Sequence, residues 1–252
     1  MPLKTLNFQL QMEKLAKVYE GKAKVIYTTK NPNEFIQYFK DDTTAFNDPS
    51  KTKIIENKGV LNNFISEFIM DELTKNGIKN HFIKRLSNRE QLIKKLTIIP
   101  LEIIIRNISA GTMAKRLGVK DGIEFDEPIF EICYKKDELG DPIINYDHAI
   151  KLLKLVNFEE LEFIRKTSFK INELLKEIFG KINIKLVDFK IEFGFDEDHN
   201  IILADEISPD SCRLWDKNTN ENLDKDRFRK NLGGLIEAYG EIASRFKIKI
   251  EL

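Results

Sequence analysis

The chain has few cysteines: only Cys133 and Cys212 occur among its 252 residues. Because they lie far apart, they form neither the close pairs of a zinc site nor the framework of a disulfide-stabilised protein. Two isolated cysteines are compatible with a reducing compartment, and we expect a cytoplasmic protein.

Long apolar runs are also missing. The sequence contains no stretch of 18 apolar residues, so no transmembrane helix is expected. Residues 1–18 lack the apolar core and the small-residue cleavage site of a secretory signal. We interpret residues 1–14 as an N-terminal extension, partly helical, ahead of the main folded part.

The chain has no net charge, since 41 Lys and Arg balance 41 Asp and Glu. A nucleic-acid-binding protein would show a basic excess, so this class is disfavoured, although clustered basic residues could still bind a small phosphorylated molecule. A hydrophobic content of 42% and a charged content of 33% indicate a soluble globular protein. Its length suits one large domain or two lobes.

The densest chemistry lies in residues 186–216. Residues 187–195 alternate strictly between apolar and charged side chains, which predicts a strand with one buried face and one charged face. If 197–200 form the loop of a hairpin, Glu192 lies opposite Asp205, with Cβ atoms ~5 Å apart. Two opposed carboxylates suit Mg²⁺, which binds one or two carboxylates. The alternative is an ordinary solvated face.

Basic residues next to turns give three further candidates. Arg213, after the turn at 208–210, could grip a carboxylate or phosphate, or pair with Asp210 or Asp216. In the predicted hairpin at 18–27, Gly21 would allow close approach to a ligand, and Lys22 and Lys24 could meet phosphates. By itself this is a weak signal, because hairpins with Gly and Lys are common.

The third candidate follows the predicted strand at 97–106. Arg106 ends this strand, and residues 109–118 form a loop that enters a short helix. Free N–H groups at a helix start, together with Ser109 and Thr112, suit an anion. Simple N-capping of the helix by Ser109 or Thr112 is the alternative.

Other patterns complete the expected secondary structure. Strands are expected at 81–85 and 128–137, and helices at 31–40, 60–75, 147–155, 157–179 and 224–246.

Three motifs, DFKIEFG, DEISPDSCRLWD and DKDRFRKNLGGLIEAY, resemble the SAICAR synthetase family, ligases of purine biosynthesis. The GKAK hairpin at 21–24 and RNISAGT at 106–112 match the family in order, and the likeness runs from residue 15 to the C-terminus. The resemblance implies an α+β, two-lobed, ATP-grasp-related fold. An N-terminal antiparallel sheet lobe at 15–98 would cover ATP, and an α+β lobe at 99–252 would hold metal and substrate.

The resemblance also implies a reaction. ATP and Mg²⁺ would serve to join L-aspartate to the carboxylate of 5-amino-1-(5-phosphoribosyl)imidazole-4-carboxylate through an acyl phosphate. The partners would be small molecules, with neither nucleic acid nor membrane, and the chain would form a homodimer. A ligase for another amine and a non-catalytic nucleotide sensor are the alternatives.

Residue roles follow from the matched motifs. Asp188, Lys190 and Arg213 would be catalytic, with Asp188 either orienting Lys190 or taking a proton from the amine. Glu192 and Asp205 would bind the metal. The residues expected at ATP are Gly21, Lys22, Ala23, Lys24 and Lys135. Those expected at the substrate are Arg106, Ser109, Gly111, Thr112, Asp210 and Arg213, with residues 41–48 lining the cleft.

Overall fold

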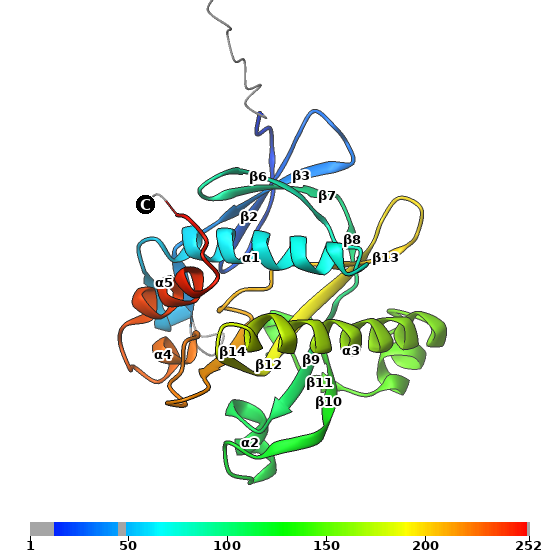
Figure 1. The fold of residues 1–252 in the computed structure, drawn as a ribbon. Helices are drawn as coiled ribbons and strands as arrows, with labels where there is room; N and C mark the ends of the chain where they lie inside the picture. Colours follow the sequence, from blue (N-terminus) through cyan, green and yellow to red (C-terminus); the bar gives the residue numbers. More distant parts are fainter. Residues whose placement is uncertain (1–12, 45–48, 251–252) are drawn as a thin grey trace, which may run out of the picture.

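The computed structural model describes residues 13–44 and 49–250. Most of the expected N-terminal extension, and residues 45–48 of the expected cleft segment, lie outside this range. The described chain forms two larger antiparallel sheets and a two-stranded one, with helices packed around them (Figure 1). The predicted α+β class is therefore confirmed.

The first sheet has five strands in the order β1-β2-β3-β7-β6. Its strands are β1 (Lys17–Glu20), β2 (Lys24–Thr28), β3 (Glu34–Phe39), β6 (Phe82–Ser87) and β7 (Glu90–Lys94). The predicted hairpin is present, because β1 and β2 pair and the Gly21 N–H donates to the Lys24 carbonyl at 2.9 Å.

The predicted helix at 31–40 is wrong, because this segment contains β3. The spacing of Phe35, Ile36 and Phe39 suits one helical face, but a six-residue run rich in aromatic side chains also suits a strand. The partners decide, since β3 lies between β2 and β7 and is hydrogen-bonded on both edges. Strand β7 was missed, because its two apolar residues, Leu92 and Ile93, are adjacent and show no alternation.

The second sheet is built around the long strand β12 (Ile184–Phe195). Its order is β11-β10-β9-β12-β13, with β14 and β8 also paired to β12. These strands are β8 (Thr97–Ile98), β9 (Leu101–Ile108), β10 (Glu124–Tyr134), β11 (Ile143–Ile144), β13 (Ile201–Ala204) and β14 (Cys212–Asp216). The short sheet pairs β4 (Asp42–Thr44) with β5 (Thr52–Ile54).

Three longer helices cover these sheets. Helix α3 (Phe158–Gly180) packs on β12 and β9, whereas α1 (Lys58–Lys75) packs on α5 (Leu235–Arg245), β6 and β3. The predicted start of α3 is confirmed by a capping box between Asn157 and Glu160. The short helical segments are η1 (Pro49–Lys51), α2 (Gly111–Leu117), η2 (Asp137–Leu139), η3 (His148–Leu152) and α4 (Asp226–Arg229).

The single helix predicted at 224–246 is also wrong. The structure has α4, a break and then α5, because Gly233 and Gly234 adopt left-handed backbone with φ of 70° and 63°. Glycine takes this conformation without the steric cost that other residues meet.

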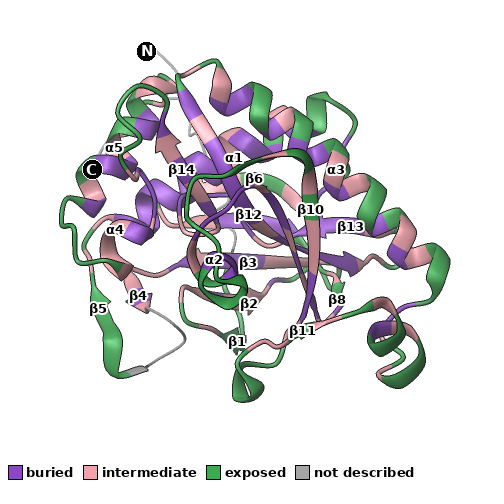
Figure 2. Ribbon diagram, turned by 90° about the horizontal axis from the view of Figure 1, so that it is seen from below, coloured by how far each residue is buried: buried purple, intermediate pink, exposed green. Residues whose placement is uncertain are grey.

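The alternation predicted for β12 is present from Phe189 to Phe193, whereas Val187 belongs to a separate small cluster with Ile108 and Ala110, because the pairing with β14 shifts register between Leu186 and Asp188. Phe189, Ile191 and Phe193 are buried in a core shared with α1, α3 and α5, and β12 is buried along most of its length (Figure 2). The chain passes from the first sheet to the second between β7 and β8. Because α1 shares the core of the second sheet, the division into lobes at residues 98 and 99 stays a prediction. None of the helices in the described residues is long and apolar enough to cross a membrane.

One ion pair ties the end of β14 to α5. Asp216 accepts a hydrogen bond from Arg245 Nη2 at 2.6 Å and from the N–H groups of Asn218 and Thr219 at 2.8 and 3.0 Å. The hydrogen bond from Arg245, followed by those two backbone bonds, lowers the pKa of Asp216 to about 2. A carboxyl whose folded pKa is depressed stabilises the fold above its unfolded pKa, and this contribution is lost as the pH falls through the folded pKa.

We therefore expect Asp216→Asn to lower the melting temperature by about 2–5 °C at pH 7. The deficit should shrink as the pH falls from about 4 towards 2, because the carboxyl is protonated first in the unfolded state and only near its folded pKa in the folded state. Thermal unfolding followed by circular dichroism from pH 7 to pH 2.5 measures it. A deficit that stays constant over this range would contradict the assigned role.

Candidate functional site

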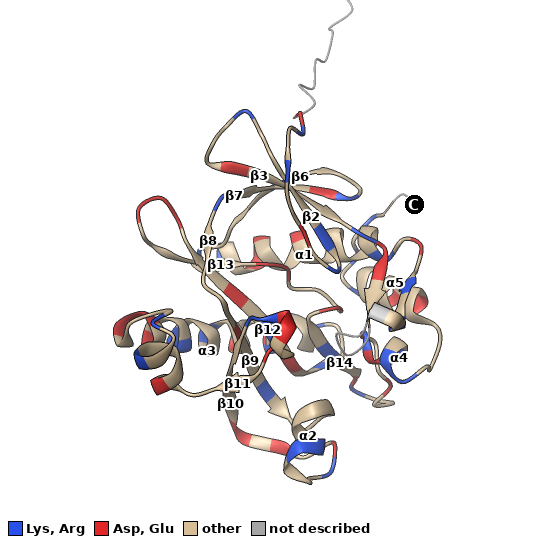
Figure 3. Ribbon diagram, turned by 180° about the vertical axis from the view of Figure 1, so that it is seen from behind, with Lys and Arg blue, Asp and Glu red and all other residues tan. Residues whose placement is uncertain are grey.

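A lysine surrounded by carboxylates lies on the polar face of β12. Lys190 Nζ donates to Glu192 Oε1 at 2.7 Å, to Asp205 Oδ2 at 3.1 Å and to Glu102 Oε1 at 3.1 Å. Figure 3 colours the acidic and basic positions on the strands that contribute, β9 and β12 among them. Glu102 was not predicted. The sequence could have indicated it, because Glu102 lies four residues before Arg106 on β9 and its side chain therefore points to the same face of the sheet.

The predicted register of the hairpin is wrong by one residue. Glu192 pairs with Ala204, not with Asp205, and the loop spans 196–200 because Phe195 pairs with Ile201. Asp196 shapes this loop by accepting hydrogen bonds from the N–H groups of residues 198 and 200. Asp205 follows the strand with left-handed backbone (φ 63°), and its carboxylate nevertheless reaches the same ammonium group as Glu192.

Two more lysines from distant parts of the chain reach the same carboxylates. Lys24, on β2, forms an ion pair with Asp205 and lies 3.5 Å from Glu206. Lys135, after β10, forms an ion pair with Glu192. The structure therefore brings five predicted residues together in one cluster, which we call the lysine–carboxylate cluster: Lys24, Lys135, Lys190, Glu192 and Asp205.

The other predicted nucleotide residues lie at the margin of this cluster. Lys22 forms an ion pair with Asp137 at 2.8 Å, where both side chains are exposed. The Ala23 carbonyl accepts a hydrogen bond from the Lys40 N–H at 2.7 Å, which holds the β1–β2 turn against the end of β3. Gly21 lies in that turn, and a Cβ atom placed on it would lie 2.9 Å from the Tyr19 hydroxyl oxygen.

The charges in the cluster stabilise one another. Burial opposes the charge on Lys190, but Glu192, Asp205 and Glu102 outweigh it and hold the pKa of Lys190 well above its ordinary value. Burial likewise opposes the charge on Asp205, yet Lys24 and Lys190 hold the pKa of that carboxyl well below its ordinary range. Both partners are therefore ionised at neutral pH. Separating them requires a ligand of high charge.

The donor set suits a hard cation. Glu192 and Asp205 offer carboxylate oxygens, the ligands that Mg²⁺ prefers, and Glu206 Oε2 is buried without a hydrogen-bond partner in the described chain. Within residues 13–44 and 49–250, no group of three or more His, Cys, Asp or Glu side chains is arranged around a metal position. Ammonium groups lie between the carboxylates instead. The two predicted ligands fit a magnesium ion bound largely by phosphate and water oxygens.

A second cluster lies further along the same face of β12. Asp188 Oδ2 accepts hydrogen bonds from Arg106 Nη1 at 2.6 Å and from Arg213 Nη1 at 2.7 Å. Arg106 Nε also donates to Glu131 at 2.6 Å, and Arg213 Nε donates to Asp226 at 3.1 Å. We call these five residues the arginine cluster. In the described chain, Arg213 forms ion pairs with Asp188 and Asp226, and not with Asp210 or Asp216 as the alternative had it. Asp188 orients two arginines rather than Lys190.

The start of α2 lies against this cluster. Gly111 has φ 62°, and a Cβ placed there would lie 2.4 Å from Arg213 Nη2, so only glycine allows this approach. The N-cap of α2 is Ala110, so the alternative interpretation, in which Ser109 or Thr112 caps the helix, is wrong. The Ser109 hydroxyl donates to the Lys120 carbonyl and accepts from the Ile123 N–H, both in the loop behind the helix. Its side chain is therefore committed away from Arg213.

Asp210 is likewise committed inside the protein. Its Oδ1 accepts from the Tyr239 hydroxyl at 2.6 Å and its Oδ2 from Lys58 Nζ at 2.9 Å. Lys58 is fully buried and also donates to the Asp42 carbonyl. The structure therefore places Asp210 as a link between α1, α5 and the turn before β14. No role was predicted for Lys58 from the sequence.

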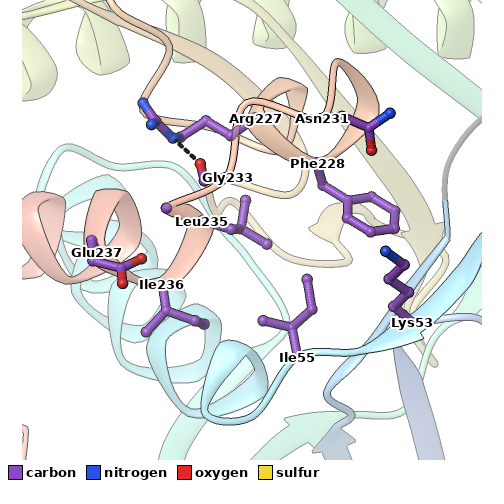
Figure 4. Close-up of a pocket in the computed structure, with 10 residues that line it drawn as sticks. Lys53, Ile55, Arg227, Phe228, Asn231, Gly233, Leu235, Ile236 and Glu237 are labelled. Atoms are coloured by element: carbon purple, nitrogen blue, oxygen red, sulfur yellow. Dashed lines mark hydrogen bonds between the residues drawn. The ribbon is translucent and has the colours of Figure 1, made fainter.

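A cavity of about 450 Å³ lies apart from both clusters, between β5 and the α4–α5 break (Figure 4). Ile55, Phe228, Leu235 and Ile236 provide apolar walls, and Lys53 lies at the side. Arg227, also in its lining, donates to the Gly233 carbonyl at 2.6 Å and so holds the break closed. None of the residues predicted for the site lines this cavity.

Comparison with known proteins gives a consistent result. The family model described as SAICAR synthetase matches residues 17–246. Among curated proteins, phosphoribosylaminoimidazole-succinocarboxamide synthase of Clostridium botulinum (strain Eklund 17B / Type B) is 55% identical over 234 residues, which is 93% of this chain and 99% of that protein.

Solved structures agree with the sequence match. The crystal structure of phosphoribosylaminoimidazole-succinocarboxamide synthase from Ehrlichia chaffeensis superposes with a TM-score of 0.91 at 52% identity, covering 94% of this chain and all of that one. A SAICAR synthetase (Type-2) in complex with ADP superposes with a TM-score of 0.89 at 45% identity, covering 93% of this chain and 99% of that one.

The fit of the lysine–carboxylate cluster to a cation can be tested without substrate. We expect Lys190→Ala to lower the melting temperature by about 5–10 °C in EDTA, because Glu102, Glu192 and Asp205 then repel one another. Millimolar MgCl₂ should recover more of this loss than it adds to the wild type. Lys185→Ala, which removes an exposed lysine of the same strand paired with Glu124, is the matched control. Equal magnesium shifts in all three proteins would contradict the assignment.

Proposed function

This chain belongs to the SAICAR synthetase family, and we propose that the lysine–carboxylate cluster carries out its ATP-dependent step. The family and its curated members establish the class of reaction: the protein is an ATP-dependent carbon–nitrogen ligase of purine biosynthesis. The likeness to the ADP complex supports nucleotide binding.

The proposed reaction joins the amine of L-aspartate to the carboxylate of 5-amino-1-(5-phosphoribosyl)imidazole-4-carboxylate. A carboxylate does not accept an amine unaided, because its oxygen is a poor leaving group. A carboxylate oxygen first attacks the γ-phosphorus of ATP, and the bond to ADP breaks. The amine nitrogen then attacks the acyl carbon, phosphate leaves with the electron pair of the C–O bond, and the amine loses its proton. Positioning and charge neutralisation do most of the work in such transfers.

The convergence of Lys24, Lys135 and Lys190 on one pair of acids is the observation that carries the proposal. A triphosphate offers the high negative charge that can draw these ammonium groups from Glu192 and Asp205. The two carboxylates would then be available to hold Mg²⁺, which neutralises phosphate charge when bound. Lys190, nearest the middle of the polar face, would contact the transferred phosphoryl group. Gly21, Lys22 and Ala23 would cover the nucleotide from the β1–β2 turn.

The arginine cluster is proposed to bind the ribose phosphate. Asp188 holds both Arg106 and Arg213, and the guanidinium group of Arg213 lies beside Gly111 at the start of α2. Planar guanidinium groups bind phosphate through paired hydrogen bonds. Asp188 serves this site by fixing both arginines. Ser109 and Asp210 would act indirectly, by shaping the loop before α2 and the turn before β14.

The cytoplasmic location and the homodimer also stay proposals. The two unpaired, buried cysteines support a reducing compartment. The family resemblance alone supports the dimer, and sedimentation equilibrium measures it. Within the described chain, the residues of both clusters come from one copy.

The proposed reaction predicts a double requirement. ADP formation, followed by a coupled assay, should need both the imidazole carboxylate and L-aspartate, and should fall to background when either is omitted. ADP release supported by a different amine would redirect the proposal to another ligase. Binding of Mg-ATP with no ADP release under any condition would indicate a nucleotide sensor.

Glu192→Gln is the variant that tests the assigned site within this assay. It keeps the size of the side chain but removes the charge that pairs with Lys135 and Lys190, so the fold should remain while ADP formation falls by at least about 100-fold, an effect of roughly 3 kcal/mol. Circular dichroism controls for folding. Near-normal turnover by the folded variant would refute the role of Glu192.

A further inference from the structure

A fully buried carboxylate that was assigned no role from the sequence lies just behind the arginine cluster. Asp224 is 0% exposed. Its Oδ2 accepts a hydrogen bond from the Leu214 N–H at 2.7 Å, and its Oδ1 accepts one from the Asp226 N–H at 2.7 Å. It forms no ion pair with any described residue. A buried carboxylate without a cation is costly, so its position requires a reason beyond packing.

One of these two hydrogen bonds, from the Leu214 N–H, replaces the last step of a strand ladder. Residues 221–223 run along the free edge of β14: the Asp216 N–H donates to the Glu221 carbonyl at 3.0 Å, and the Leu223 N–H donates to the Leu214 carbonyl at 2.8 Å. At the next position the Leu214 N–H meets the side chain of Asp224 instead of a backbone carbonyl. The main chain is therefore free to turn into α4 directly after residue 223.

This early turn brings two functional residues together. Leu214 follows Arg213 on β14, and Asp226 is the second residue after Asp224. One carboxylate thus holds the backbone next to both ends of the Arg213–Asp226 ion pair, whose Nε–Oδ2 distance is 3.1 Å. Asp226 in turn binds Arg229 at 2.7 Å, so the same turn sets the position of a third charged side chain.

We propose that Asp224 is a positioning residue for Arg213: its two hydrogen bonds set β14 against the start of α4, so that Asp226 and Asp188 hold the guanidinium beside Gly111. The proposal rests on the assignment of the arginine cluster to the substrate phosphate. It assigns Asp224 an effect mainly on one substrate, because none of the residues of the lysine–carboxylate cluster lies on β14 or α4.

Burial also shapes the chemistry of Asp224 itself. Burial, with the neighbouring charge of Asp226, raises the pKa of Asp224 to about 7, while the two backbone hydrogen bonds and Arg229 oppose this. The geometry alone, however, predicts the outcome of substitution. Asn offers one oxygen, so its NH₂ group must face one of the two N–H donors, and the turn loses one of its two hydrogen bonds.

The test compares Asp224→Asn with Asp216→Asn, a matched change of a buried carboxylate on β14 that also accepts two backbone N–H bonds but lies at the end away from Arg213. We expect Asp224→Asn to raise KM for the phosphoribosyl substrate about 10-fold, or roughly 1.4 kcal/mol, with KM for ATP changed less than twofold. Asp216→Asn should lower stability without this split. Equal changes in both KM values, or the same split in both variants, would overturn the proposal.

A second measurement does not depend on the reaction. Hydrogen exchange of the Arg213 Nε–H, followed by NMR, should be at least about 10-fold faster in Asp224→Asn than in the wild type, and unchanged in Asp216→Asn. Should Asp224→Asn fail to fold, Asp224→Ser keeps an acceptor for the Asp226 N–H while losing the bond to Leu214. Unchanged exchange in the folded variant would overturn the proposal. If exchange of the Arg213 Nε–H is faster in Asp224→Asn but the wild type shows no ligase activity, the positioning role of Asp224 stands and the proposed function is refuted.

Discussion

The attraction between Lys190 and its three carboxylates is the interaction on which the site depends. Lys190 lies on β12, Glu102 on β9 and Asp205 just after β13, so one ammonium group links three strands of the second sheet. Lys24 adds a link to the first sheet. Such buried charges stabilise a fold only while they remain paired. In the free protein, the charged groups proposed to bind the nucleotide and the metal are therefore already in place and paired with one another.

The strict alternation of β12 explains why two anion sites lie on one surface. Its apolar side chains fill the core, so Asp188, Lys190 and Glu192 must all face the other way. Residues two apart on a strand are separated by roughly 7 Å. The arginine cluster at Asp188 and the lysine–carboxylate cluster at Lys190 are therefore neighbours. That spacing suits a substrate whose phosphate is anchored at one cluster while its carboxylate reacts at the other.

Sequence patterns predicted the structure well where a pattern is compatible with few local structures. The alternation of β12, the cap of α3 and the lysines that meet near Glu192 are local or strongly charged signals. The errors concern properties set by tertiary neighbours. The loop at 196–200, held by Asp196, is one residue longer than expected and shifted the hairpin register, and two partner strands made residues 34–39 a strand instead of a helix. Hydrogen bonds of Ser109 and Asp210 to distant segments took both side chains away from the expected roles, and no local pattern announces such partners.

The central claim is that a divalent cation and the nucleotide phosphates take the place of the internal ion pairs at Glu192 and Asp205. Crystals grown with ADP and Mn²⁺, a visible substitute for Mg²⁺, test it directly through anomalous scattering. We predict an anomalous peak within coordination distance of both carboxylates, with Lys24 and Lys190 turned towards phosphate oxygens. A peak bound elsewhere, with the Lys190–Glu192 and Lys24–Asp205 pairs intact beside bound nucleotide, would contradict it.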